Sequence, residues 1–322
     1  MGKKKNTPPL EEHLVLPTHP SRLDSVESDH AATVDTHTHL LSTFEAYRAT
    51  YKPGKHETIW DFVKAMYHGR RVEAIVDVWC EAPVRRAQWK ELADSALDEE
   101  QRERNWSGIE YWFVMGVHPL EAMAHPRCVG WGEIGLDYHY DNSPREIQQQ
   151  VFVRQLRHAI RLGKPLTIHT REAEDDTERI LKEEVPKDHP VHIHCYTDSP
   201  EWAARMLAHF PNLFIGITGV ITYATNLNTS AVIRQMISSK SSLSPSDALR
   251  IVLETDAPFM VPGNLYNSLP EIKGRRLPLC HTAMLPWTAE FVSRVANEAG
   301  GTWDLESVMK VARENARKMY GI

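Results

Sequence analysis

The stretch VDTHTHL, residues 34–40, places two histidines two positions apart in a β-branched and apolar setting. Successive side chains of an extended chain point to opposite faces, so His37 and His39 share one side if this stretch is a strand. Two imidazoles at that spacing can bind one metal ion. Two hydrogen-bonded histidines at a strand end would give the same pattern, and the pair by itself leaves both interpretations open.

Runs of similar composition recur along the chain and are separated by amphipathic segments. Phe152, Leu156 and Ile160 repeat at helical spacing in one of these segments. Alternating strands and helices favour parallel pairing, and eight such units closing on themselves form a TIM (β/α)8 barrel, an α/β fold. The candidate strands are residues 32–35, 72–79, 111–117, 129–134, 165–168, 191–193, 213–217 and 250–253.

The length of 322 residues fits either two ordinary domains or one large barrel. No linker or internal repeat divides the chain, so we expect a single barrel over residues 31–322. Residues 1–30 carry four prolines and little periodicity, which predicts an extended N-terminal tail or a segment that lies on the surface. The stretches 41–71 and 81–110 exceed a normal connection, which predicts enlarged loops with extra helices after strands 1 and 2.

The composition excludes several classes of protein. A net charge of −6 opposes binding of polyanions, so contact with nucleic acid requires a local patch or a bound metal. The four cysteines form no CxxC pair, which fits neither a disulfide framework nor a zinc ribbon and indicates a reducing compartment. There is no signal-like or membrane-length apolar run, so we expect a cytoplasmic or nuclear protein without a membrane partner.

Further metal-ligand side chains stand at the ends of other predicted strands. The carboxyl ends of barrel strands converge on one face, where such folds place their active sites. Four histidines and two carboxylates there suffice for two divalent ions, and this mixture leaves Mg²⁺, Mn²⁺ and Zn²⁺ open. The added side chains are those of Glu133, His169, His194 and Asp256.

Two neighbouring metal ions suit displacement at phosphorus, because together they stabilise the attacking and the leaving oxygen. A phosphodiester is therefore the leading substrate class. Asp256 would accept or orient the proton of the attacking water, and Glu133 is the other predicted catalytic carboxylate.

Six motifs in order resemble the TatD-type metal-dependent deoxyribonucleases of the amidohydrolase superfamily. They are VDTHTHL at 34–40, GVHP at 116–119, GEIGLD at 132–137, IHTR at 168–171, HCYT at 194–197 and ETDAP at 254–258. The resemblance runs from about residue 31 to the end of the chain. It implies a dinuclear site and hydrolysis of DNA, with 3′-5′ exonuclease activity.

Carried over by position, the resemblance assigns His37, His39 and Asp256 to one ion, His169 and His194 to the other, and Glu133 as the bridge. Arg171 and His118 match positions next to the metals and are predicted substrate contacts, Arg171 to a phosphate; a structural salt bridge is its alternative role. Asp137 would orient a ligand histidine through a hydrogen bond, or support packing.

Aromatic side chains after the predicted strands are candidates for stacking on nucleobases. Tyr138 follows the fourth strand and Tyr196 follows the sixth. Ordinary loop packing is the alternative for both. We predict that they contact substrate.

Two departures from the family pattern affect specificity more than metal chemistry. Asp198 replaces a glycine, and Leu279-Cys280-His281-Thr282 replaces an Asn-Glu-Pro-like segment. The enlarged 41–110 region also departs, which suggests a surface for a protein partner.

Two other functions compete with a nuclease. The first is hydrolysis of a small ester or amide on the same barrel, but many such enzymes bridge their metals with a modified lysine where this chain has Glu133. The second is a non-catalytic scaffold that binds a protein partner. Loss of ligands would be its signature, and all six are present.

Overall fold

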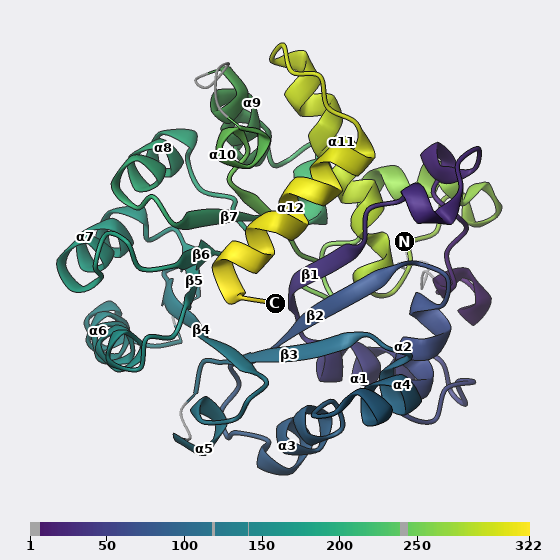
Figure 1. Cartoon of the computed structure of the whole chain (residues 1–322), viewed down its shortest axis with the longest axis horizontal. Coiled ribbons are helices and arrows are strands. Elements are labelled where there is room, and N and C mark those ends of the chain that lie inside the picture. The colour runs from purple at the N-terminus through teal and green to yellow at the C-terminus, as the bar shows by residue number, and fades with distance from the viewer. Residues whose placement is uncertain (1–6, 118–119, 141, 239–243) are drawn as a thin grey trace, which may run out of the picture.

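The computed structural model describes residues 7–117, 120–140, 142–238 and 244–322. One parallel sheet holds strands in chain order, each paired with the next, and it curls into a nearly closed barrel (Figure 1). The strands are β1 Thr33–Thr38, β2 Val72–Trp79, β3 Glu110–Met115, β4 Cys128–Asp137, β5 Leu166–Arg171, β6 Val191–Ile193, β7 Leu213–Ile217 and β8 Ile251–Leu253. The predicted TIM-barrel fold is confirmed.

Helices surround the sheet (Figure 1). The α-helices are α1 Leu40–Thr50, α2 Ile59–Tyr67, α3 Arg86–Asp94, α4 Glu99–Trp106, α5 Leu120–Met123, α6 Arg145–Arg161, α7 Glu174–Glu184, α8 Pro200–His209, α9 Asn228–Ser238, α10 Pro245–Ala248, α11 Leu285–Glu298 and α12 Leu305–Tyr320. Shorter 3-10 helices are η1 Glu11–Leu14, η2 Pro20–Arg22, η3 Glu27–Asp29, η4 Gly219–Thr222, η5 Gly263–Ser268, η6 Pro270–Ile272 and η7 Thr282–Met284. The enlarged connections after β1 and β2 hold α1 with α2 and α3 with α4, as predicted.

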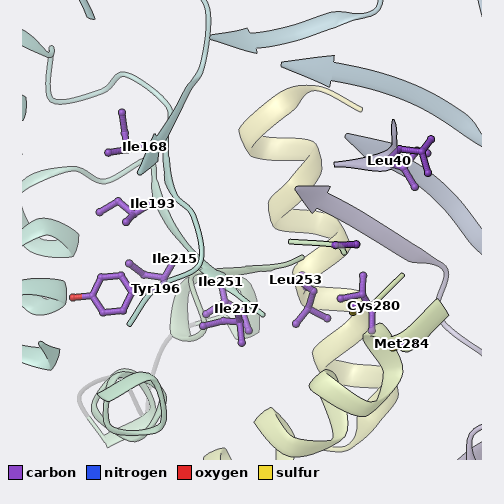
Figure 2. Packing of buried hydrophobic residues seen from close by; sticks show 14 of the residues in the cluster. Leu40, Ile168, Ile193, Tyr196, Ile215, Ile217, Ile251, Leu253, Cys280 and Met284 are labelled. Atoms are coloured by element: carbon purple, nitrogen blue, oxygen red, sulfur yellow. The ribbon is translucent and has the colours of Figure 1, made fainter. Parts of the chain in front are cut away.

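The strands alternate between two apolar layers. One lies between sheet and helices; Figure 2 shows Ile168, Ile193, Ile215 and Ile251 of neighbouring strands in it. The other fills the barrel interior, where residues of β1, β2, β3, β7 and β8 pack against Met319 and other residues of α12. Because side chains alternate along a strand, the residues next to the outward isoleucines point inward.

Three strands run further than their apolar runs predict. β1 extends to Thr38, β4 to Asp137 and β5 to Arg171. Their polar ends stay in the sheet because the neighbouring strand continues the ladder; Gly135 pairs with His169 and Asp137 with Arg171. The ladder therefore holds several ligand-type side chains on rigid backbone.

Hydrogen bonds outside the regular strand pairing connect the end of β1 to β8 and to the segment that follows β8. Asp256 N–H donates to His37 O at 2.9 Å, and His39 N–H donates to Ala257 O at 2.9 Å. The Thr36 hydroxyl donates to Leu253 O at 3.0 Å. These bonds fix the ends of the two strands against each other.

The segment 7–30 packs on the barrel. Leu14 and Leu16 are buried at 0% and 1% exposure, and His281 Nε2 lies 3.0 Å from Leu14 O. Arg22 donates to Glu306 of α12 through Nε at 2.7 Å and Nη2 at 3.0 Å. No helix within the described ranges combines the length and the apolar composition that crossing a membrane requires.

Replacing Arg22 with alanine is expected to loosen this segment. The change leaves the Glu306 carboxylate without its bidentate partner and should lower the free energy of unfolding by about 1–3 kcal/mol. Urea unfolding and limited proteolysis within residues 7–30 would measure it. Arg157→Ala, which removes a bidentate pair with Glu184 on the exposed surface, is the control and should change neither. Equal effects of the two variants would contradict the anchoring role.

Candidate metal centre

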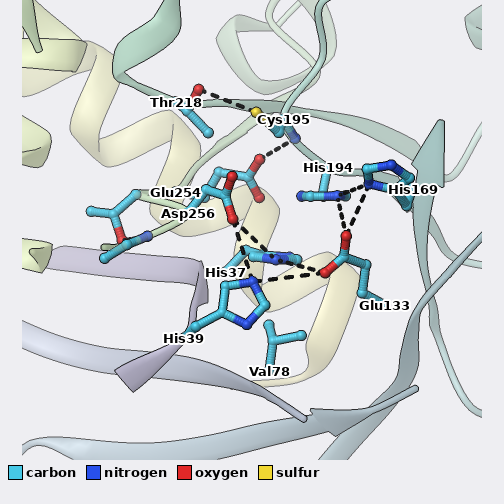
Figure 3. Close-up of polar contacts among 12 residues, drawn as sticks. His37, His39, Val78, Glu133, His169, His194, Cys195, Thr218, Glu254 and Asp256 are labelled. Atoms are coloured by element: carbon cyan, nitrogen blue, oxygen red, sulfur yellow. Dashed lines mark hydrogen bonds and ion pairs between the residues drawn. The ribbon is translucent and has the colours of Figure 1, made fainter. Parts of the chain in front are cut away.

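Six ligand-type side chains meet at the carboxyl ends of the strands (Figure 3). Their sources are β1 for His37, the residue after β1 for His39, β4 for Glu133, β5 for His169, the residue after β6 for His194 and the loop after β8 for Asp256. Each strand delivers its ligand because the alternation that turns isoleucines outward turns these residues inward.

The first cluster contains His37, His39, Asp256 and one oxygen of Glu133. Asp256 Oδ1 lies 3.7 Å from His37 Nε2 and 3.4 Å from His39 Nε2. Glu133 Oε2 lies 3.6 Å and 3.7 Å from the same two nitrogens. Bonds of about 2.1 Å to a tetrahedral ion separate its ligands by about 3.4 Å, so these four atoms suit one ion.

The second cluster contains His169, His194 and the other oxygen of Glu133. Glu133 Oε1 lies 2.9 Å from His169 Nδ1 and 2.9 Å from His194 Nε2. The two nitrogens are themselves 2.9 Å apart. One carboxylate therefore offers a separate oxygen to each cluster.

The electrostatics favour an anionic Glu133 and a neutral His37, as metal ligands require, whereas His194 would lose a proton on binding a metal ion. Burial alone would raise the pKa of Glu133, but His194 and His169 hold it well below its usual range, so the carboxylate is ionised. Burial and the neighbouring His194 lower the pKa of His37 to about 4, which keeps its imidazole neutral. Burial opposes the charge of His194, but Glu133 outweighs it and raises the pKa to about 9.

These donors fit divalent metal ions. His37 Nε2 is fully buried and has no hydrogen-bond partner among the described residues. Three overlapping sets each keep all their ligand atoms within 4.8 Å of one another: His37 with His194 and Asp256, His37 with His39 and Glu133, and Glu133 with His169 and His194. Imidazoles with carboxylates are ligands that zinc and manganese accept.

Asp137 and Arg171 lie next to the second cluster. His169 Nε2 is 3.3 Å from Asp137 Oδ2, so the ring nitrogen that faces away from Glu133 has a carboxylate partner. Arg171 Nη1 lies 3.8 Å from the same oxygen, and its guanidinium is 5.1 Å from the ring of Tyr140. With 41% of its side chain exposed, Arg171 can reach a substrate as well. Its predicted role stays a prediction.

Among the other predicted substrate contacts, Tyr138 and Tyr196 both have hydrogen-bond partners inside the protein. The Tyr138 hydroxyl donates to Asp176 at 2.8 Å, and the Arg145 guanidinium covers the ring at 4.3 Å. Tyr196 is 1% exposed, stacks on Trp202 and donates to Ser199 O at 2.6 Å. The prediction for Tyr196 is therefore corrected, because its ring and hydroxyl are both used inside the protein. His118 lies outside the described residues.

The sequence-level assignment missed the carboxylates that support the ligands. Asp35 accepts bonds from the hydroxyls of Thr255 and Thr282, each at 2.7 Å, and burial raises its pKa to about 7. Asp77 accepts the N–H of Leu40 at 2.8 Å at the start of α1. No local pattern identifies Asp35, because its hydroxyl partners come from the segment after β8 and from η7.

The two departures from the family pattern have structural counterparts. Thr282 binds Asp35, and His281 binds the N-terminal segment, so the 279–282 stretch fastens the barrel seam. The Asp198 carboxylate is mostly buried, with no partner for Oδ2 among the described residues. Burial and the charge of Glu174 raise its pKa to about 7.

Sequence comparison finds relatives that are named as nucleases. The human 3'-5' RNA nuclease TATDN2 is 33% identical over 226 residues, which are 66% of this chain and 27% of that protein. The 3'-5' ssDNA/RNA exonuclease TatD of Escherichia coli K12 is 28% identical over 225 residues, or 66% of this chain and 78% of that protein. The chain thus spans just over a quarter of the length of the human relative.

Solved structures share the fold. An uncharacterized amidohydrolase from Saccharomyces cerevisiae has a TM-score of 0.66 at 17% identity and covers 90% of this chain and 100% of its own. The TatD homologue YjjV from Escherichia coli has a TM-score of 0.62 at 19% identity, with 90% and 98% covered. The model of the family described as TatD related DNase matches residues 34–321, nearly the whole barrel. The chain belongs to the TatD related DNase family.

Proposed function

We propose that this chain is a metal-dependent hydrolase that cleaves phosphodiester bonds of DNA and removes nucleotides from 3′ ends. The observation that carries the proposal is Glu133, whose two oxygens face two different histidine clusters. Relatives named as an RNA nuclease and as an ssDNA/RNA exonuclease support a nucleic-acid substrate. Because both names include RNA, the test below includes RNA.

Two divalent ions, Mg²⁺, Mn²⁺ or Zn²⁺, are the proposed cofactors. His37, His39 and Asp256 would hold one, and His169 and His194 the other. Ions bound there would lower the pKa of water towards about 7 and neutralise charge on the attacking and leaving oxygens. Glu133 would keep the two clusters at a fixed separation.

The chain's own side chains carry the remaining steps. Burial alone would raise the pKa of Asp256, but the neighbouring histidines outweigh burial and lower it, so the carboxylate is ionised. It would accept the proton of the attacking water. Arg171 and His118 would bind the phosphate, and Asp137 would hold the ring of His169 in place. Tyr138, which is partly buried and follows β4, would contact the substrate.

Three proposals concern organisation. Residues 31–322 would form the single catalytic unit, with the preceding segment docked on it. The 41–110 connections, which hold α1 to α4, would offer a surface to a protein partner. The protein would act in the cytoplasm or the nucleus.

End-labelled oligonucleotides test the activity. Single-stranded DNA, double-stranded DNA and single-stranded RNA would be digested with Mg²⁺, Mn²⁺ or Zn²⁺, and products followed over time. We expect a metal-dependent ladder from the 3′ end. His169→Ala should slow it by more than the roughly 10–100-fold that loss of an outer partner costs, because a ligand itself is removed.

His68→Ala, at an exposed position after α2, is the matched control and should keep the wild-type rate. Cleavage that persists in His169→Ala, or that needs no metal, would contradict the proposed site. A metal-loaded protein that cleaves none of the three nucleic acids would contradict the nuclease function.

A further inference from the structure

A second polar layer lies beneath the ligands. On β5, on β6 and directly after β8, a polar residue stands two positions before a candidate ligand and faces the barrel interior. These residues are Thr167 before His169, His192 before His194 and Glu254 before Asp256. All three are 0% exposed. None of them has a role in the reaction proposed above.

The layer contains a buried contact between a histidine and a carboxylate. His192 Nε2 lies 2.9 Å from Glu254 Oε2, and both side chains are 0% exposed. Gly216 of β7 faces the pair, and a side chain there would collide with both partners. A buried carboxylate is costly unless the polar groups around it are also hydrogen-bonded.

The hydroxyl of Tyr320 provides a hydrogen-bond partner for this layer from one end of the barrel. This hydroxyl lies 2.8 Å from His192 Nδ1 and 2.7 Å from Thr167 Oγ1. The residue ends α12, which crosses one end of the barrel with its last turn over the centre (Figure 1). A Cβ on Gly130, near the start of β4, would lie 3.3 Å from the Tyr320 ring, so the hydroxyl enters from the end opposite the ligands.

Glu254 connects the lower layer to the ligands. Its Oε1 accepts the backbone N–H of Cys195, the residue that follows His194 (Figure 3). Cys195 has a φ of 45°, a left-handed conformation that a non-glycine residue adopts only when its surroundings hold it. The carboxylate therefore holds the backbone turn that aims His194 at Glu133.

We propose that Tyr320 is a positioning residue for the metal centre, acting through His192 and Glu254 on the His169 and His194 cluster. The contacts run from α12 through β6 and β8 to the turn after His194. Thr167 gives a second connection, since it stands on β5 two positions before His169. The inference rests on the proposed function only in that these histidines bind metal.

Tyr320→Phe tests the proposal, because it removes one hydroxyl and keeps the ring. Metal-free protein would be titrated with Mn²⁺ and with Zn²⁺ by calorimetry, well below the unfolding temperature. We expect one binding step to weaken by about 10–100-fold, the cost typical of losing a partner outside the ligand shell. His192→Gln, which keeps a donor for Glu254 but loses the ring nitrogen facing Tyr320, should weaken the same step.

Tyr47→Phe is the matched control. Tyr47 is also 0% exposed, and its hydroxyl also makes two hydrogen bonds, to Glu11 at 2.5 Å and from His56 N at 2.9 Å. Neither partner belongs to the metal centre. This variant should lose thermal stability without a change in metal affinity.

Unchanged metal affinity in both Tyr320→Phe and His192→Gln would overturn the proposal and leave Tyr320 a packing residue. A wild-type protein that binds neither metal would overturn it as well. Because the titration contains no nucleic acid, its result is separate from the nuclease test. Weakened binding in a protein that cleaves no nucleic acid would support the positioning role and contradict only the proposed activity.

Discussion

Glu133→Gln is expected to remove metal-dependent cleavage, with a fall in rate of at least about a thousandfold, or ~4 kcal/mol. Glutamine has nearly the same shape, but its amide nitrogen cannot ligate a cation and its charge is zero. Whichever way the amide points, one of the two clusters loses its oxygen, because Oε1 faces His169 and His194 while Oε2 faces His37 and His39.

Initial rates on end-labelled single-stranded DNA, together with bound metal per protein, would measure this effect. We expect the variant to fold and to hold less metal. Glu172→Gln is the control: Glu172 also lies 2.8 Å from a histidine, His139, but both are exposed and outside the ligand set. A Glu133→Gln protein with a tenth or more of the wild-type rate would exclude a bridging role.

Gly135→Ala is expected to damage both the fold and the site. Gly135 has a φ of 154°, and a Cβ there would overlap the carbonyl oxygen of His169 on the neighbouring strand. The two residues are register partners, so the strands can relieve the overlap only by separating at a ligand. The expected loss is about 3 kcal/mol or more of unfolding free energy, with loss of metal from the second cluster.

Urea unfolding and metal titration of the soluble fraction would check this prediction. Gly274→Ala is the control that separates the strain of a positive φ from the steric overlap. Gly274 has a φ of 80°, but no atom lies within 4 Å of the position that its Cβ would take. It should cost only the roughly 1–2 kcal/mol of a left-handed alanine and leave metal binding unchanged. Equal losses in the two variants would show that backbone conformation, and not the contact with β5, explains the effect.

Local pattern was sufficient for the barrel and for the candidate ligands. Apolar runs alternating with amphipathic segments predicted every strand, and three of them, 72–79, 191–193 and 213–217, have the predicted bounds. Period-two alternation inside a parallel barrel places His37, Glu133, His169 and His194 on one side, whatever the loops do. The ligands could be predicted because a strand's two faces are set by its own sequence.

Local pattern was insufficient wherever a side chain's partner comes from a distant segment. The composition of residues 7–30 left open an extended tail or a segment on the surface, and only the contact of Arg22 with Glu306 on the last helix decided between them. Glu306 is 284 positions from Arg22, so the sequence around Arg22 does not contain the partner that anchors it.

The sequence by itself therefore determined the fold and the set of candidate metal-ligand residues, because periodicity along each strand and the shared face of a closed barrel follow from local composition. Only the tertiary structure decided how the ligands are supported. Asp35 meets Thr282 across 247 positions, and Tyr320 meets Thr167 across 153. Such contacts depend on how the last helix and the loops pack on the barrel, and no repeating pattern along the chain encodes that packing.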